Sequence, residues 1–138
     1  MCNWSDVEIV FRDGKRVKIP AATIIDACEI IKDAAKQRRL ITYTEIMDQL
    51  KARGNRKINR ATIGGIVGEV SAQVSKVTNP SIYPSAIVVL KGTNYPGNGF
   101  WGIDTGTNPP KNVPEKMRRV VIRRYQDDIF SREWDCNC

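Results

Sequence analysis

The side chains that most often carry catalysis or bind metals are scarce in this sequence. It contains no histidine and four cysteines, Cys2, Cys28, Cys136 and Cys138, three of which lie at the ends of the chain. Cysteines can form a disulfide framework or a metal site, but zinc normally takes two close cysteine pairs or pairs completed by histidines. A single Cys-x-Cys does not support zinc, and we predict neither a metal site nor a cofactor.

Acid–base and nucleophilic chemistry have little support either. The acidic residues of the C-terminal half that could cluster are Asp104, Glu115, Asp127 and Asp128, and the last two are more typical of a solvated helix face. Ser85 belongs to no Ser-His or Ser-Lys arrangement, and no phosphate-binding glycine motif occurs. We therefore predict no catalytic residue.

Basic residues, by contrast, are abundant and clustered. Lys and Arg number 22 against 15 Asp and Glu, which gives a formal net charge of +7 over 138 residues. This excess attracts polyanions, with nucleic acid as the first candidate and an anionic membrane surface as the second. The clusters are Lys51, Arg53, Arg56, Lys57 and Arg60, and Lys116, Arg118, Arg119, Arg123 and Arg124. Each cluster is consistent either with phosphate contacts or with a solvated surface.

The elements that would position these clusters begin with a β-hairpin over residues 1–20. Its strands are Val7–Phe11 and Arg16–Ile19, joined by the turn signal Asp13-Gly14-Lys15. Helical spacing of apolar residues then predicts a first helix over Ala22–Arg38. Thr42, with Glu45 three residues later, predicts the cap of a second helix that ends at Gly54.

A third helix is predicted over Asn59–Ser75, followed by a strand over Ala86–Leu90. A glycine-rich connection and a short strand at Phe100 and Trp101 complete a core over residues 21–102. This order predicts an α+β fold of winged helix-turn-helix type. A loop over 103–113 then leads to a last helix and tail over 114–138, and the residues expected to dock that helix are Met117, Val120, Val121, Tyr125 and Phe130.

The length and hydropathy of the chain indicate one soluble domain over residues 1–138. No apolar run approaches the roughly 18 residues of a membrane-spanning helix, and Met1–Asp6 lacks a signal-peptide pattern. We expect a cytoplasmic or nucleoid-associated protein with no membrane partner.

The third helix has an unusual outer face of small residues. If Ile63, Val67, Val70 and Val74 point inward, Ala61, Gly65, Gly68 and Ala72 point outward. Glycine in a helix interior costs about 1 kcal/mol relative to alanine, so the glycines imply close approach to another surface. That surface is either another helix or the minor groove of DNA, which is roughly 6 Å wide and admits only small side chains.

The order of several motifs resembles the C-terminal domain of alkylguanine DNA alkyltransferases and of their inactive alkyltransferase-like relatives. The similar segments are Ile41–Ile46, Ile63–Val67 and Tyr83–Val89, within a resemblance over Ala22–Trp101. The resemblance implies that Tyr43 pushes on the phosphate of a flipped nucleotide. It aligns the family's arginine finger with Ala61, one position from Arg60.

The resemblance does not extend to the family's reactive motif. Ser85, Ala86 and Ile87 stand where the family has its nucleophilic cysteine, its histidine and its arginine. Alkyl transfer requires a thiolate supported by a base, so this activity is not expected.

We therefore predict a non-catalytic protein that binds double-stranded DNA through the minor groove and reads a modified, damaged or flipped base. The residues predicted to contact DNA are Tyr43, Arg53, Arg56, Lys57, Asn59, Arg60, Ala61, Thr62, Gly65, Tyr83, Ser85 and Trp101. Two alternatives remain open at this stage. One is a nucleic-acid-modifying or repair enzyme whose Tyr83–Ala86 loop lines a pocket, and the other is a protein-interaction module in phage or host defence or in transcription.

Overall fold

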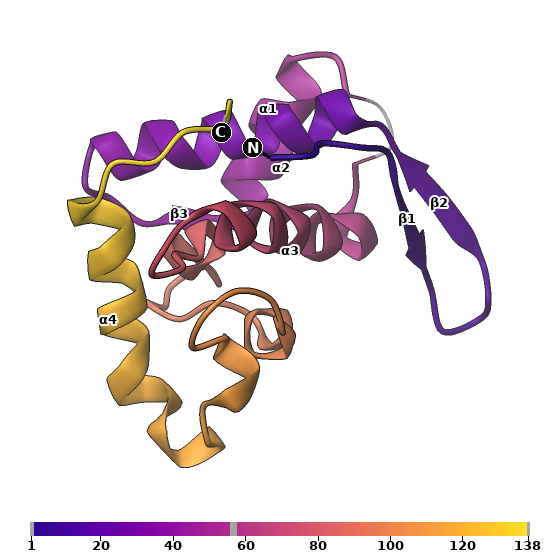
Figure 1. Cartoon of the computed structure of the whole chain (residues 1–138). Coiled ribbons are helices and arrows are strands. Elements are labelled where there is room, and N and C mark those ends of the chain that lie inside the picture. Colours follow the sequence, from indigo (N-terminus) through magenta and orange to yellow (C-terminus); the bar gives the residue numbers. More distant parts are fainter. Residues whose placement is uncertain (1, 56–57, 138) are drawn as a thin grey trace.

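The computed structural model describes residues 2–55 and 58–137 and has an α+β fold. The helices are α1 (Ala21–Lys36), α2 (Tyr43–Ala52), α3 (Arg60–Val77) and α4 (Arg118–Ser131), and the strands are β1 (Val7–Val10), β2 (Arg16–Ile19), β3 (Ile41–Thr42) and β4 (Val88–Val89). Figure 1 shows α1, α2 and α3 grouped together, with the hairpin on one side and α4 on the other.

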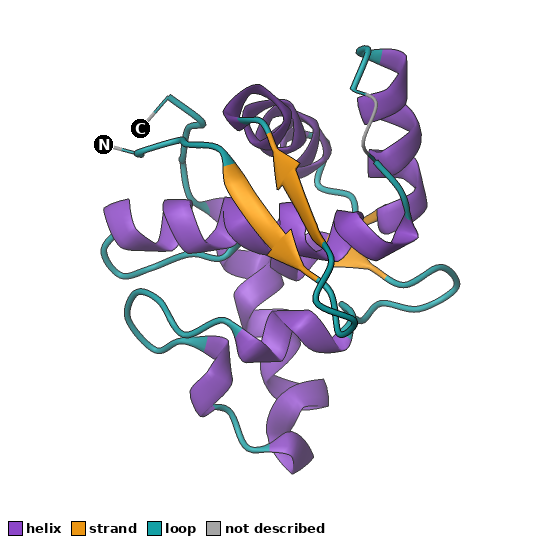
Figure 2. Ribbon diagram, turned by 90° about the vertical axis from the view of Figure 1, so that its right-hand side faces the viewer, coloured by secondary structure: helices purple, strands orange, loops and turns teal. Residues whose placement is uncertain are grey.

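The predicted N-terminal hairpin is confirmed. Strands β1 and β2 pair antiparallel, with Val7 opposite Ile19 and Val10 opposite Arg16. The turn uses Gly14 at a φ of 84°, a left-handed conformation that glycine adopts without a steric penalty. Figure 2 faces the hairpin and shows its two strands lying across the helices.

Helices α2 and α3 both begin with a capping box, and the one at α2 was predicted from the sequence. The Thr42 side chain accepts a hydrogen bond from the Glu45 N–H, and the Glu45 carboxylate accepts one from the Thr42 N–H, which forms the expected capping box. Asn59 caps α3 in the same way, with Thr62 as its reciprocal partner. Apolar side chains from the hairpin, all four helices and the C-terminal segment form the larger hydrophobic core.

The structure differs from the prediction after α3, where the first expected wing strand is shortened and the second is replaced by a 3₁₀ helix. Only Val88–Val89 is extended, and this strand pairs in parallel with β3. The preceding residues form the 3₁₀ helix η1 (Pro84–Ile87), buried throughout, in which the Ser85 N–H donates to the Ser71 hydroxyl and not to a neighbouring strand. Phe100 and Trp101 lie in another 3₁₀ helix, η2 (Asn98–Gly102), because their rings pack into a second, smaller core.

Helix α4 is present as predicted, and Tyr125 and Phe130 pack against the hydrophobic cores as expected, but its most buried residues are others. Its buried residues are Ile122, Gln126 and Ile129, at the i, i+4 and i+7 spacing of a single helix face. The prediction was wrong for Met117 and Val120, which are exposed, Val120 by 72%. Two further 3₁₀ turns, η3 (Pro110–Asn112) and η4 (Glu115–Met117), join η2 to α4.

The residues after α4 return to α1 and are held there by a disulfide. Cys28 of α1 and Cys136 are bonded and buried, and Cys2 is also disulfide-bonded. The Trp4 indole N–H donates to the Cys136 carbonyl at 2.7 Å, so the N-terminal segment lies against the same region. Disulfides are rare in cytosolic proteins, so this bond does not fit the expected cytoplasmic location.

In the part of the chain that the structure describes, no helix is long and apolar enough to cross a membrane.

Candidate functional site

A cavity of about 330 Å³ lies between the first turn of α2, the N-terminal half of α3 and the glycine-rich loop after β4. Three groups of residues line it. They are Thr42, Tyr43, Thr44 and Met47 from the α2 region, Arg60, Ile63, Gly64, Val67 and Gly68 from α3, and Ser85, Val89, Leu90, Lys91, Gly97, Gly99 and Phe100 from the following segments. We call this cavity the α3 pocket. Its volume falls in the range of small-molecule sites.

Tyr43 and Phe100 contribute the aromatic rings of the α3 pocket. The Tyr43 hydroxyl accepts a hydrogen bond from the Gly97 N–H at 3.0 Å, which ties the start of α2 to the glycine-rich loop. Burial raises the pKa of the Tyr43 phenol above its usual value, although the Gly97 hydrogen bond acts in the opposite direction. The phenol therefore keeps its proton at neutral pH and can donate to a ligand.

Ser85 supplies a hydroxyl to the α3 pocket from the buried helix η1. Its side chain is only 2% exposed and hydrogen-bonds the Ser71 hydroxyl of α3 at 2.5 Å, with either oxygen able to donate. Because the Ser71 oxygen also accepts from the Ser85 backbone N–H, two hydrogen bonds fix this serine. Ser85 is therefore a positioned polar group in an otherwise largely apolar lining.

The side of α3 that lines the pocket is open at two glycines. A side chain at Gly64 or Gly68 would meet nothing within 4 Å of its Cβ atom. Arg60 lies one turn before Gly64 on the same side, is exposed and lines the pocket. This strip, comprising Arg60, Gly64 and Gly68, was not identified as a pocket wall from the sequence, although its i, i+4 and i+8 spacing could have indicated it.

The small face of α3 is not bare along its whole width, which corrects the sequence prediction. A Cβ atom at Gly65 would lie 2.8 Å from Cδ1 of Ile9, because the hairpin packs against this side of the helix. Gly65 therefore accommodates the hairpin, although the residue itself remains exposed, and its role as a DNA contact stays a prediction. Ala61 remains exposed between Gly65 and the pocket side, as predicted.

The side chains of Asn59 and Thr62, which cap α3, are engaged in the hydrogen bonds of that cap. The Asn59 carboxamide oxygen accepts from the N–H groups of Ala61 and Thr62. Thr62 is fully buried, and its hydroxyl bonds back to Asn59. Thr62 therefore cannot contact DNA as predicted, while Asn59 is exposed at the helix start but already hydrogen-bonded.

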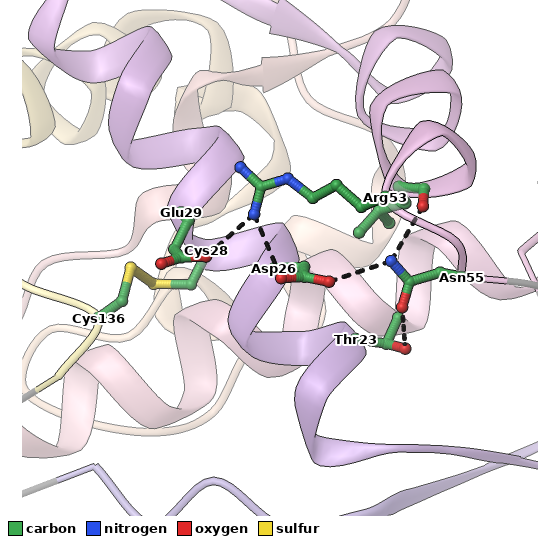
Figure 3. A network of polar contacts seen from close by, with 8 residues as sticks. Thr23, Asp26, Cys28, Glu29, Arg53, Asn55 and Cys136 are labelled. Atoms are coloured by element: carbon green, nitrogen blue, oxygen red, sulfur yellow. Dashed lines mark hydrogen bonds and ion pairs between the residues drawn. A yellow bond between two sulfur atoms is a disulfide. The ribbon is translucent and has the colours of Figure 1, made fainter.

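Arg53 was predicted to contact phosphate, and its position corrects that prediction. Its guanidinium lies 3.2 Å from an Asp26 oxygen and 3.0 Å from a Glu29 oxygen, both on α1 (Figure 3). Burial acts to lower the pKa of Arg53, but the two carboxylates raise this pKa above its ordinary value. The charge of Arg53 is thus neutralised within the protein. Arg56 and Lys57 lie outside the described residues.

Two aromatic residues predicted to contact DNA are instead part of the second core. Tyr83 is 1% exposed, its hydroxyl donates to the carbonyls of Thr105 and Thr107, and burial raises its pKa to about 12. Trp101 is 8% exposed and packs edge-on against Phe100, with the Arg118 guanidinium over its ring at 5.4 Å. Neither ring face is available to stack on a base, so both predictions are corrected.

Few side chains that line the α3 pocket are titratable. Its described lining contains no carboxylate and no thiol, and its titratable side chains are Tyr43, Arg60 and Lys91. Ser85 occupies the position of the nucleophile in the family resemblance, and no base lines the pocket beside it. Within residues 2–55 and 58–137, no group of three or more acidic or cysteine side chains could hold a metal ion.

No protein-family model, curated protein or solved structure matches this chain. The function is therefore inferred from the site.

Proposed function

We propose that this protein is a non-catalytic DNA-binding protein that lays the N-terminal half of α3 in the minor groove and takes a nucleobase into the α3 pocket. The observation that carries this proposal is the position of the pocket directly beside the open strip of Arg60, Gly64 and Gly68. A duplex lying along this strip would bring its bases next to a cavity of suitable size.

The lining of the α3 pocket suits a planar ring with a polar edge. Tyr43 and Phe100 provide aromatic surfaces, and stacking of a base on an aromatic side chain is worth roughly 1 to 3 kcal/mol. The hydroxyls of Tyr43 and Ser85 can hydrogen-bond the edge of the ring. Arg60 and Lys91, exposed in the lining, supply positive charge for the adjacent phosphates.

The shape of α3 favours the minor groove over the major groove. Between Arg60 and Ala72 the exposed residues of α3 are Ala61, Gly64 and Gly65, and Gly68 and Glu69 are half-buried. Such a surface can enter a groove roughly 6 Å wide, whereas recognition in the wider major groove relies on long side chains. Close approach of a helix to DNA also accounts for the cost of glycines at open positions.

The proposed fold type is a winged helix-turn-helix in which α2 and α3 are the paired helices. The glycine-rich loop from Lys91 to Gly99 takes the place of the wing. The resemblance to alkylguanine DNA alkyltransferases gains support from the pocket, because Tyr43 and Ser85, which it matches to the phosphate-pushing tyrosine and the nucleophile, both line it. The replaced reactive motif makes recognition without alkyl transfer the proposed outcome.

The test is a fluorescence anisotropy titration of the full chain with a labelled duplex at two salt concentrations. We expect binding that weakens as salt rises, since phosphate contacts release counterions. A duplex carrying 2-aminopurine should brighten on binding if a base leaves the stack. Absence of binding at low salt would overturn the proposal. Binding without brightening would mean that no base leaves the stack to enter the α3 pocket.

The variant Gly68→Leu tests the open strip directly. A Cβ atom at this position meets no neighbour within 4 Å, and leucine is a better helix former than glycine, so the domain should remain folded. We expect a loss of DNA affinity of about tenfold or more, equivalent to ~1.4 kcal/mol. Gly102→Leu is the matched control, because Gly102 is also open but does not line the pocket, and its affinity should be unchanged.

A further inference from the structure

The basic residues of this protein divide into two groups by their ion pairing. Within the described residues, the basic side chains that form ion pairs are Lys15, Arg16, Lys18, Lys32, Arg39, Arg53 and Lys111. The five basic residues between Lys116 and Arg124 form no ion pair with any described residue. The largest group of uncompensated cations therefore lies on and just before α4.

Most of these cations are exposed. At 100° per residue, Arg119 and Arg123 lie along one flank of α4, beside its buried residues, and Arg124 lies on the side opposite to them. Lys116 precedes them in η4 beside the exposed Glu115, and Asp127 and Asp128 lie one turn after Arg123 and Arg124. We call Lys116, Arg119, Arg123 and Arg124 the α4 basic face.

The α4 basic face is physically connected to the wall of the α3 pocket. The guanidinium of Arg119 lies over the ring of Tyr95 at 5.3 Å, and Tyr95 belongs to the glycine-rich loop that lines the pocket. From the buried side of α4, the Gln126 side-chain amide donates to the carbonyls of Ala86 and Asn94, both at 3.0 Å. Helix α4 thus holds the segment on either side of β4, and its cations continue outward from this loop.

We propose that the α4 basic face binds the sugar-phosphate backbone of the same DNA that the α3 pocket engages. This inference rests on the proposed function. The three arginines span about 7.5 Å of helix axis at 1.5 Å per residue. That length is about the axial rise of two nucleotides of one strand. Together with Lys116, the face is suited to two or three phosphates.

A membrane surface fits the α4 basic face less well than a nucleic acid backbone. A helix that lies in a bilayer interface presents a broad apolar side to the lipid. The apolar side of α4, with Ile122 and Ile129, is buried against the protein, and Val120 and Met117 are its large exposed apolar residues. The free side therefore offers charge without the apolar area that insertion requires.

The triple variant Lys116→Ala, Arg123→Ala, Arg124→Ala tests the proposal and leaves the Arg119–Tyr95 contact intact. We expect the slope of log K against log salt to become shallower by about two, since each phosphate contact contributes about 0.9. The matched control is Lys15→Ala, Arg16→Ala, Lys18→Ala, which removes the same charge from exposed but ion-paired positions of the hairpin. Its slope should change by less than one.

The outcomes separate this inference from the proposed function. If the wild-type protein binds DNA and Gly68→Leu weakens it, but the triple variant keeps the wild-type slope, the α4 proposal is overturned and the α3 proposal stands. If the triple variant loses the slope while Gly68→Leu has no effect, α4 binds the backbone, but the α3 proposal is overturned and with it the claim that both engage the same DNA. Sedimentation with phosphatidylserine vesicles that depends on the same three residues, with no change in DNA binding, would overturn the choice of nucleic acid.

Discussion

Arg53 and Arg123 are both exposed arginines of a basic protein, but they have opposite surroundings. Arg53 is held by Asp26 and Glu29 of α1, next to Asn55 and close to the Cys28–Cys136 disulfide (Figure 3). Arg123 lies on the α4 basic face and forms no ion pair with a described residue. We call Arg53 and the hydrogen-bonded residues around it, Thr23, Asp26, Glu29 and Asn55, the α1–α2 network.

The difference teaches that the position of a basic residue in the chain does not indicate what it does. The one cation of the α1–α2 network, Arg53, makes contacts within the protein, whereas those of the α4 basic face carry charge toward solvent. The first region should therefore respond to mutation through stability and the second through binding of polyanions. The following changes test that separation, beginning with the largest expected effect.

Removal of the disulfide beside the α1–α2 network should have the largest effect on stability. The variant Cys28→Ser, Cys136→Ser opens a link between residues 108 positions apart. Loss of a native disulfide typically lowers the free energy of unfolding by 2–5 kcal/mol, and long loops fall toward the upper end on the chain-entropy model. Urea denaturation followed by circular dichroism measures this loss.

DNA affinity provides the contrast for this variant. Below its unfolding transition, the double serine variant should bind DNA with the affinity and salt slope of the wild type, because neither cysteine lies in the α3 pocket or on the α4 basic face. Equal stability of the two proteins would show that the bond does not hold the C-terminal segment. A change in slope would show that the two regions are not independent.

Asn55→Ala should have the next largest effect, because the Asn55 side chain bonds two residues of α1 and one of α2. Its side chain donates to an Asp26 oxygen and to the Leu50 carbonyl and accepts from the Thr23 hydroxyl at 2.6 Å. Thr23 is buried, so its hydroxyl would lose a partner that water cannot fully replace. We expect the free energy of unfolding to fall by about 1–3 kcal/mol.

The matched control for this change is Asn3→Ala, at an exposed asparagine of the N-terminal segment. Its unfolding free energy should stay within about 0.5 kcal/mol of the wild type, as for most surface substitutions. Similar losses for both variants would mean that the network adds nothing specific to stability.

Local signals in the sequence were sufficient to predict most of the helical core. The starts of α2 and α3 are encoded by short-range hydrogen bonds, Thr42 with Glu45 and Asn59 with Thr62, and such bonds depend only on neighbours in the chain. The hairpin turn at Gly14 is equally local. These elements appeared at the predicted positions within one or two residues.

The candidate site was predictable only in part, because its remaining features depend on distant contacts. Tyr43 and Ser85 were identified through motif order, and both line the α3 pocket. Nothing near Gly65 in the sequence reveals that Ile9 packs against it, and nothing near Arg53 reveals two carboxylates from α1.

The buried face of α4 also could not be identified from the sequence alone. Apolar residues occur around most of its circumference, so periodicity alone did not select the buried face. That face includes Gln126, which is buried because it bonds the carbonyls of Ala86 and Asn94. A polar residue in this role carries no sequence signal for burial, and the exposed Val120 carries a misleading one.

The most direct test of the comparison substitutes one arginine from each region, and it has the smallest expected effect on stability. Arg53→Ala should lower the free energy of unfolding by no more than about 1 kcal/mol, since its ion pairs are partly exposed, and should leave the salt slope of DNA binding unchanged. Arg123→Ala should leave stability within about 0.5 kcal/mol of the wild type. Its salt slope should be shallower by about 0.9, the contribution of one phosphate contact.

Each variant is the charge-matched control of the other, because both remove one positive charge from an exposed arginine. If both variants shift the slope equally, net charge alone sets DNA affinity, and ion pairing within the protein does not decide which arginines bind. If only Arg123→Ala shifts it, the carboxylates of Asp26 and Glu29 have removed Arg53 from the binding surface, and the same reasoning extends to the ion-paired lysines and arginine of the hairpin.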